Sequence, residues 1–312
     1  MQRPPYVPIV MLDGWVLERY YGWRVVTAGP RLKLLRKRIG PVERSLLLCW
    51  ACEPRDIEQA ARSGHLLGAF QISTIVDLSA SDHPAFLQLA GHRLERATER
   101  PWFGAGTFVF DLAEEEGVLF GGMAARERSK CNQARRGGID VRFTTAPTAG
   151  ELQQFLELHG KMASSRALEI LSPAVLQHMF ARGDALLACC HAGSGPPLVM
   201  NVIYLCGDQG CFLHGAKAEE IPAGAGQLAQ WSTVLELKRR GFRWYDLGLV
   251  ASADPKDGIY RFKRALGGSF VDLGTEFRFV APLLAAPYRW AHALRPMARR
   301  LRGWLPGGTG SG

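Results

Sequence analysis

The sequence predicts an α+β protein with mixed central sheets. Three short apolar segments of strand length follow one another at residues 186–191, 198–206 and 210–215. Glycine, proline and aspartate residues lie between them, which is typical of hairpin turns. A helical segment and a further strand then follow within residues 224–248. Hairpins followed by a helix and a strand indicate a mixed sheet that is covered by helices.

Residues 224–248 carry the clearest helix signal. Apolar residues recur there at spacings of three and four, as on one face of a helix: Leu228, Trp231, Val234, Leu235 and Leu237. Gly241 follows Lys238, Arg239 and Arg240, so the predicted helix has a stop signal and cations at its negative end. Residues 242–247 then alternate well enough for a strand that ends at Asp246 and Gly248.

Two glycines, Gly224 and Gly226, precede this helix. A glycine loop that leads into a helix presents free backbone N–H groups, which can hold a phosphate or polarise a carbonyl. We therefore expect both glycines at the binding site of an acyl donor. The alternative is ordinary turn chemistry, which the same pattern also fits.

The other expected elements are spread along the chain. Strands are expected at residues 23–27, 45–52, 73–78 and 107–112, and helices at 54–63, 83–97, 123–136, 148–162 and 173–182, the last capped by Ser172. Acidic residues follow the strand that ends at residue 112: Glu114, Glu115 and Glu116. They mark the expected boundary between two halves of the chain.

The chain is basic, with a net charge of +9 and a pI near 9.4. This charge predicts an anionic partner. The expected helix at 123–136 contributes Arg128 and Lys130, which are candidate binding residues for the phosphates of a nucleotide, a lipid pyrophosphate, coenzyme A or a tRNA. The alternative is a basic surface that only contacts water.

Cysteine usage and the absence of an export signal both predict a cytoplasmic protein. The seven cysteines lie mostly in apolar runs. Cys49 and Cys52 have the spacing of half a zinc or redox site, but no second pair accompanies them, so we expect no metal and free thiols. Residues 1–13 lack a secretory apolar region, and no apolar run reaches the roughly 20 residues of a membrane span.

Residues 282–312 form a basic tail. Trp290, Leu294, Met297, Leu301 and Trp304 recur at helical spacing, and no acidic residue follows Glu276. A basic amphipathic segment with tryptophans can lie on an anionic membrane. This pattern predicts peripheral contact with the inner face of the membrane. The alternative is a helix packed on the edge of the sheet.

Four segments together resemble the Fem-type aminoacyltransferases and the related GNAT-superfamily acyltransferases. They are residues 128–141 (RSKCNQARRGGIDV), 212–216 (FLHGA), 237–248 (LKRRGFRWYDLG) and 258–268 (GIYRFKRALGG). The last, with its Gly-x-Tyr-x-Phe-Lys element, is the most specific. The resemblance covers about residues 114–279. Asn132 departs from it, because the family usually has a second basic residue there.

The resemblance implies two tandem GNAT-like halves with mixed central sheets. Residues 1–112 would form a degenerate N-terminal half, residues 113–281 the catalytic half, and residues 282–312 the tail. A short internal similarity fits a duplication. An expected helix, a glycine (Gly64 or Gly68) and a strand that ends in Val-Asp-Leu at 76–78 resemble the later helix, Gly241 and strand that ends in Tyr-Asp-Leu at 245–247.

The resemblance also assigns roles to side chains. Lys263 is expected beside the reacting carbonyl, where its charge stabilises the oxygen that becomes negative, and Phe262 is expected to shape the pocket. Tyr260 is expected to bind a substrate. Asp246, at a strand end, and His214, before Gly215, are the candidate bases for the proton of the amine, with water as the alternative.

The sequence leaves the acyl donor open between acyl-CoA and aminoacyl-tRNA. Coenzyme A-dependent members usually have Gln or Arg three residues before the first loop glycine, where this chain has Ile221. We expect no tightly bound cofactor, and an amine acceptor such as a peptidoglycan precursor or an amino sugar. The alternative function is a non-catalytic protein that binds RNA or serves as a scaffold at the membrane.

Overall fold

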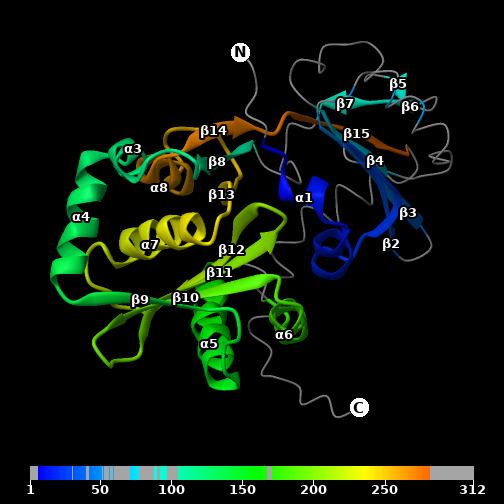
Figure 1. Ribbon diagram of the computed structural model, residues 1–312. Helices are drawn as coiled ribbons and strands as arrows, with labels where there is room; N and C mark the ends of the chain where they lie inside the picture. Colours follow the sequence, from blue (N-terminus) through cyan, green and yellow to red (C-terminus); the bar gives the residue numbers. More distant parts are fainter. Residues whose placement is uncertain are drawn as a thin grey trace.

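The computed structural model describes residues 6–29, 31–39, 42–50, 71–76, 88–89, 92–96, 105–166 and 171–281, with residues 52, 56 and 59. The strands of these residues form two large sheets (Figure 1). The basic tail lies outside the described residues, and the helix expected at 54–63 lies almost wholly outside them.

The first sheet contains strands from both ends of the chain. Its order is β1-β2-β3-β4-β15-β7, with β1 Arg24–Ala28, β2 Leu32–Ile39, β3 Val42–Cys49, β4 Gln71–Val76, β15 Thr275–Val280 and β7 Glu95–Arg96. The strands predicted at 23–27, 45–52 and 73–78 are confirmed. The strand β2 was not among those expected from the sequence, because it carries three consecutive basic residues, Arg36, Lys37 and Arg38. In the sheet Arg36 of β2 pairs with Glu43 of β3 at 3.1 Å.

The helix predicted at residues 83–97 is wrong where the structure describes it. β5 (Gln88–Leu89) pairs with β6 (His92–Arg93), and Arg96 of β7 lies opposite Phe277 of β15. Strand pairing overrides local helix propensity here, both in the short β5–β6 pair and between β7 and the distant β15. Gly91, between β5 and β6, is also a poor residue for a helix interior.

The second sheet is mixed. Its order is β14-β8-β13-β12-β11-β10-β9, with β14 Ser269–Asp272, β8 Gly106–Asp111, β13 Trp244–Val250, β12 Gln209–Lys217, β11 Pro197–Cys206, β10 Ala185–Ala192 and β9 Ile139–Thr144. The pair β12 and β13 is parallel, and the other neighbours are antiparallel. The predicted α+β class and the hairpins β10-β11-β12 are confirmed.

Helices cover both faces of the second sheet (Figure 1). On one face lie α3 (Glu116–Gly122), α4 (Ala125–Arg136), α7 (Ala225–Arg239) and α8 (Gly258–Leu266), which share one apolar core with the strands. On the other lie α5 (Ala149–Arg166) and α6 (Pro173–Ala181), with a second core. The helix α6 begins at Pro173 as predicted, but the Ser172 side chain makes no capping hydrogen bond. Proline alone favours that start.

The N-terminal segment joins the two sheets. It contains α1 (Ile9–Leu12) and a π-helix, η1 (Val16–Tyr20), neither of which is marked by a pattern in the sequence. A third apolar core includes Leu17 of this segment, Leu46 of the first sheet and Trp244 of the second. Apolar contacts thus hold both sheets against one segment.

The sheets also exchange strands. β8 precedes the boundary predicted after residue 112 but pairs in the second sheet, and β15, near the end of the described chain, pairs in the first. The division into two halves stays a prediction. Across the predicted boundaries, β8 of the first half pairs in the second sheet and β15 of the second half pairs in the first sheet.

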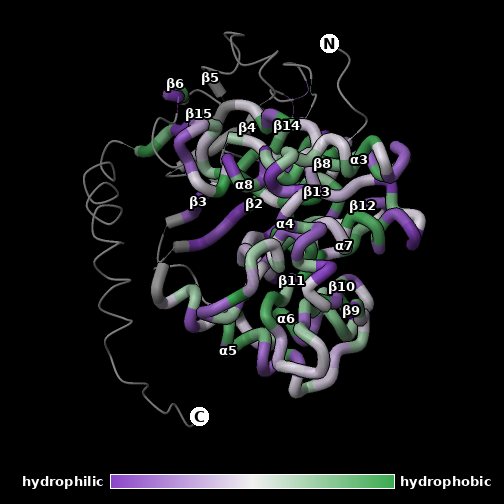
Figure 2. The backbone as a smooth tube through the Cα atoms, turned by 90° about the vertical axis from the view of Figure 1, so that its left-hand side faces the viewer, coloured by the Kyte–Doolittle hydropathy of each residue, from purple (hydrophilic) through white to green (hydrophobic). Residues whose placement is uncertain are grey.

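Hydrophobic and hydrophilic stretches alternate along the described chain (Figure 2). None of its helices is both long enough and apolar enough to pass through a membrane.

Candidate active site

The candidate site lies where the parallel strands β12 and β13 stop pairing. Their register ends with Cys211 opposite Asp246. Two residues later Gly248 has a φ of +79° but still lies within β13, which continues to Val250, past the strand end predicted from the sequence. The register of β13 with β8 shifts between Asp246 and Leu249, and we call this irregular part of β13 the Gly248 turn. A Cβ on Gly248 would lie 2.6 Å from the backbone oxygen of Phe212, so only glycine fits without a shift of the backbone. The Asp-x-Gly pattern of the sequence therefore has a steric cause.

The helix α8 places Lys263 at this turn. The helix begins after Asp257, whose carboxylate accepts a hydrogen bond from the backbone N–H of Tyr260 at 2.8 Å, as an N-cap does. Lys263 is only 9% exposed, and its ammonium donates to the backbone oxygens of Gly248 at 2.8 Å and Leu249 at 2.9 Å. Because an ammonium has three N–H groups, these acceptors within the described chain leave one donor for a further partner.

Burial lowers the pKa of Lys263 to about 8, because the charged form loses hydration. The negative charge of Asp246 acts in the opposite direction. The side chain is therefore mostly cationic at neutral pH but close to its titration range. A cation with one remaining donor in a poorly hydrated place is suited to stabilise an oxygen that becomes negative.

Asp246 is buried, and protein donors bind both of its oxygens. Its Oδ1 accepts hydrogen bonds from the backbone N–H of Gly248 at 2.7 Å and from the hydroxyl of Thr107, and its Oδ2 accepts one from the hydroxyl of Tyr6. The Thr107 oxygen also lies 2.8 Å from the carbonyl oxygen of Gly248. The structure thus brings Asp246 and Lys263 to the same turn.

His214 belongs to a different group of side chains. Its Nε2 lies 2.5 Å from the hydroxyl oxygen of Tyr20, and its ring is edge-on to that of buried His159, with centroids 5.0 Å apart. Burial, and then the neighbouring His159, lower the pKa of His214 to about 3. Such a histidine accepts a proton poorly at neutral pH. Its role as the base stays a prediction that these surroundings do not favour.

The two aromatic residues of the Tyr-x-Phe-Lys element have different surroundings. Phe262 is 39% exposed, beside the buried Lys263. Tyr260 packs edge to face on Phe108 and Phe270, with ring centroids 5.3 and 5.8 Å away. Phe262 is therefore accessible to a substrate, whereas Tyr260 takes part in the packing of α8 on β8 and β14.

The two loop glycines also differ. Gly224 has a φ of +90°, and a Cβ there would lie 2.1 Å from the backbone oxygen of Lys130. This glycine thus permits the close approach of α4 and α7. Gly226, in contrast, has open space around it, because a Cβ on this residue would meet nothing within 4 Å. Of the two, Gly226 is the one that a ligand could approach.

A carboxylate lies beside the first turn of α7. Glu127 of α4 accepts a hydrogen bond from the side-chain amide of Gln227 at 2.6 Å, and the ammonium of Lys130 lies 2.9 and 3.1 Å from its two oxygens. The N-terminal end of a helix attracts negative charge. The carboxylate of Glu127 therefore places negative charge close to the first turn of α7, where a phosphate was expected, and Lys130 is already paired.

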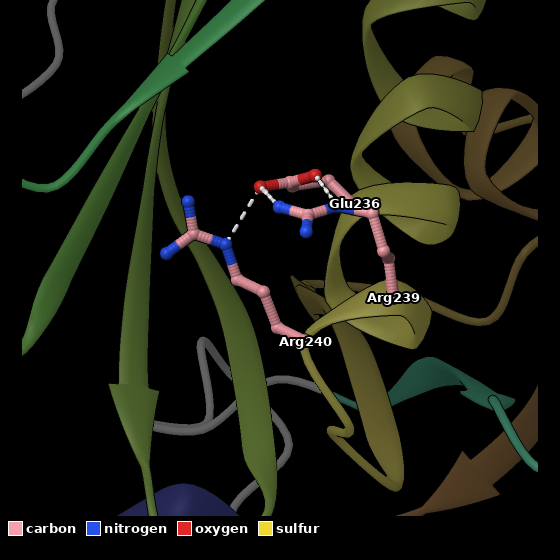
Figure 3. A network of polar contacts seen from close by, with 3 residues as sticks. All are labelled: Glu236, Arg239 and Arg240. Carbon is pink, nitrogen blue, oxygen red and sulfur yellow. Dashed lines mark hydrogen bonds and ion pairs between the residues drawn. The ribbon is translucent and has the colours of Figure 1, made fainter.

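Other cations of the predicted basic segments also have protein partners. Arg128 donates to the backbone oxygen of Gly121 at 2.8 Å. At the C-terminal end of α7, Glu236 binds Arg239 at 2.8 Å and Arg240 at 2.7 Å (Figure 3). The cations predicted at this end of the helix thus form a local ion-pair network. These contacts reduce the charge that is free for a substrate.

Four residues at these contacts were not predicted: Tyr6, Tyr20, Thr107 and Glu127. Tyr6, Tyr20 and Thr107 lie 240, 194 and 139 positions from their partners. Nothing local in the sequence marks such contacts. The pair of Glu127 and Lys130 has the spacing of neighbours on a helix, which could have revealed it.

A separate cavity of about 500 Å³ lies between α3, β8 and β14. None of the predicted site residues lines it. Within the described ranges, no group of three or more histidine, cysteine, aspartate or glutamate side chains is arranged to hold a metal ion.

Part of the sequence matches a known family. Residues 123–264 match the family model of the acetyltransferase (GNAT) domain. The matched segment runs from α4 to α8 and includes β12, β13 and Lys263. The predicted GNAT-like fold is thus confirmed.

Among solved structures, the chain is similar to FemX, a Fem-type aminoacyltransferase, with a TM-score of 0.67 and 14% identity over 90% of this chain and 95% of FemX. It is also similar to the lysyl-phosphatidylglycerol synthetase L-PGS from Bacillus licheniformis, with a TM-score of 0.58 and 13% identity over 93% of this chain and 98% of L-PGS. At these identities the similarity shows the fold alone. No curated protein matches the chain in sequence.

Proposed function

We propose that this chain is an N-acyltransferase of the GNAT and Fem-like type, which transfers an acyl or aminoacyl group to an amine. The observation that carries this proposal is Lys263, whose buried ammonium is held by the carbonyl oxygens of Gly248 and Leu249 and keeps one further N–H. The GNAT match of residues 123–264 supports the reaction class.

The proposed reaction uses few groups. The neutral amine attacks the carbonyl carbon of the donor, a new C–N bond forms, and the bond to the sulfur or oxygen of the leaving group breaks. The carbonyl oxygen becomes negative on the way, and the remaining N–H of Lys263 is suited to stabilise it. Exposed Phe262 offers an apolar contact to the substrate. The base is proposed among Asp246, His214 and water.

Two donors fit the proposal, namely acyl-CoA, which is the donor of GNAT domains, and aminoacyl-tRNA. The carboxylate of Glu127 beside the first turn of α7 would repel a pyrophosphate at that helix end. With Ile221 near the loop, this favours aminoacyl-tRNA or a donor that is held elsewhere. For the acceptor we propose the amine of a cell-wall precursor or an amino sugar, which would place the enzyme in the cytoplasm at the inner face of the membrane.

The experiment is an acyl-transfer assay of the purified chain with acetyl-CoA, longer acyl-CoA species and aminoacyl-tRNA. Each donor is combined with amino sugars and lysine-containing muropeptides, and products are identified by mass spectrometry. Lys263→Ala should lower turnover by roughly 100-fold or more. Lys238→Ala is the matched control, because Lys238 also donates to two backbone oxygens, those of Leu112 at 2.8 Å and Glu114 at 2.9 Å.

Full turnover by Lys263→Ala would contradict the proposed role of this lysine. Absence of transfer with every donor, together with unchanged tRNA or vesicle binding by Lys263→Ala, would favour the alternative of a non-catalytic RNA-binding protein or membrane scaffold.

A further inference from the structure

The N-terminal segment reaches the candidate site through a buried tyrosine. Tyr6 is 1% exposed, and its hydroxyl donates to Oδ2 of Asp246, a residue 240 positions away. Its ring packs edge to face on that of Trp244, with centroids 6.1 Å apart. The tyrosine is thus fixed at both its ring and its hydroxyl.

The other oxygen of Asp246 holds the turn that binds Lys263. Oδ1 accepts the backbone N–H of Gly248 at 2.7 Å and is contacted by the hydroxyl of Thr107. Gly248 then presents its carbonyl oxygen to the Lys263 ammonium at 2.8 Å. A continuous series of hydrogen bonds therefore runs from Tyr6 to the ammonium of Lys263.

We propose that Tyr6 and Thr107 are positioning residues for Lys263. They hold Asp246, Asp246 holds the turn at Gly248, and the carbonyl oxygen of Gly248 holds the ammonium. The catalytic consequence rests on the proposed function, but the placement of Lys263 can be measured without it.

The physical reason is the geometry that such a donor needs. A group that stabilises a developing charge must be held within about 0.5 Å of its productive position by packing and by further hydrogen bonds. A long lysine side chain has several rotatable bonds and does not supply this order by itself. If the hydroxyl of Tyr6 or Thr107 is removed, an oxygen of the buried Asp246 carboxylate loses one hydrogen-bond donor. This loss favours movement of the turn.

The test compares Tyr6→Phe with Tyr204→Phe. Tyr204 is the matched control, because it is also 1% exposed and also donates its hydroxyl to a carboxylate, that of Asp13. Each protein is treated briefly with acetic anhydride at pH 8, and acetylation of Lys263 is measured by mass spectrometry relative to that of Lys238. Tyr6→Phe should change the acetylation rate of Lys263 by roughly fivefold, as expected for one lost hydrogen bond. Tyr204→Phe should leave it unchanged.

Thr107→Val provides a second variant, and Thr107→Ser, which keeps the hydroxyl, should restore the normal rate. Unchanged acetylation of Lys263 in both Tyr6→Phe and Thr107→Val would overturn the proposal. Should neither variant fold, hydrogen exchange of the unmodified protein decides. Protection of the Gly248 amide supports the proposal, and exchange at the rate of exposed backbone overturns it.

The acyl-transfer assay separates the positioning role from the proposed function. If acyl transfer occurs, Tyr6→Phe should lower kcat with little change in KM, because the lost order concerns a group that acts in the transition state. If acetylation of Lys263 responds to Tyr6→Phe but no donor supports transfer, the positioning stands and the proposed function fails.

Discussion

The ammonium nitrogen of Lys263 lies 2.8 Å from the carbonyl oxygen of Gly248, and a Cβ on Gly248 would lie 3.5 Å from that nitrogen. The two residues are 15 positions apart, on α8 and within β13. Their contact brings together two of the segments that carry the resemblance, the one that ends in Asp-x-Gly and the Gly-x-Tyr-x-Phe-Lys element. The proposed chemistry depends on this contact.

The first prediction concerns pH. Since burial lowers the pKa of Lys263 to about 8, the cationic form is present below that pH and is lost above it. Acyl transfer by the unmodified protein should therefore fall as pH rises through about 8, by roughly tenfold per pH unit well above it. The acceptor in this assay should be hydroxylamine, which stays neutral across the range.

Lys263→Arg is the control for this pH profile. A guanidinium stays charged throughout the range, so the residual activity of this variant should not fall above pH 8. The same decline in both proteins would assign the titration to another group.

The second prediction concerns Gly248 and uses Gly138 as its control. The two glycines have φ values of +79° and +77°, so replacement by alanine costs similar backbone strain at both. Only at Gly248 does the added methyl meet an atom, the oxygen of Phe212 at 2.6 Å, whereas Gly138 has nothing within 4 Å. Gly248→Ala should therefore lower the free energy of unfolding by about 2 kcal/mol more than Gly138→Ala. Equal losses of the free energy of unfolding in the two variants, as measured by urea denaturation, would show that the backbone around Gly248 shifts to accommodate the methyl group.

The fold of the second sheet was largely predictable, because its signals are local. The hairpin strands β10 to β12 have turn residues between apolar runs, and α7 has an apolar face with Gly241 after it. The first sheet was less predictable. β2 carries Arg36, Lys37 and Arg38, and only its pairing with β1 and β3 makes it a strand. The pairing of β15 with β4 joins residues about 200 positions apart, which no local pattern reveals.

The site was predictable in part for the same reason. Lys263, Asp246 and Phe262 were expected from short motifs, and the structure brings Lys263 and Asp246 to one turn. Tyr6 and Thr107 could not be predicted, since a tyrosine or threonine bound to a distant carboxylate has no pattern of its own. His214 was expected as a candidate base from its place before Gly215, and in the structure its ring contacts Tyr20 and His159.

The third prediction concerns stability in acid. Burial and His159 lower the pKa of His214 to about 3, below the value of about 6.5 in an unfolded chain. Between these values the unfolded state binds more protons than the folded state, so the free energy of unfolding falls as pH decreases. His214→Gln should reduce the fall in the free energy of unfolding between pH 7 and pH 5 by on the order of 1 kcal/mol. Urea denaturation at both pH values measures this difference. An unchanged loss would show that His214 protonates freely in the folded protein.

The fourth prediction concerns the donor and the carboxylate beside α7. Glu127→Gln keeps an oxygen for Gln227, which lies 2.6 Å away in the unmodified protein, but removes the negative charge and releases Lys130 from its ion pair. Coenzyme A should therefore bind the variant roughly tenfold more tightly than the unmodified protein, as expected for about 1.4 kcal/mol of removed repulsion. Isothermal titration calorimetry at low salt measures the difference, which should shrink at high salt because mobile ions screen it.

Glu116→Gln is the control for this change of charge, because Glu116 lies exposed in the first turn of α3 rather than beside α7. It alters the net charge equally, so a purely general electrostatic effect would strengthen coenzyme A binding in both variants. A gain confined to Glu127→Gln would mean that the first turn of α7 can accept a phosphate and that Glu127 normally excludes it. Tight coenzyme A binding by the unmodified protein at physiological salt would instead make acyl-CoA the donor, because such binding requires a phosphate site that this carboxylate does not block.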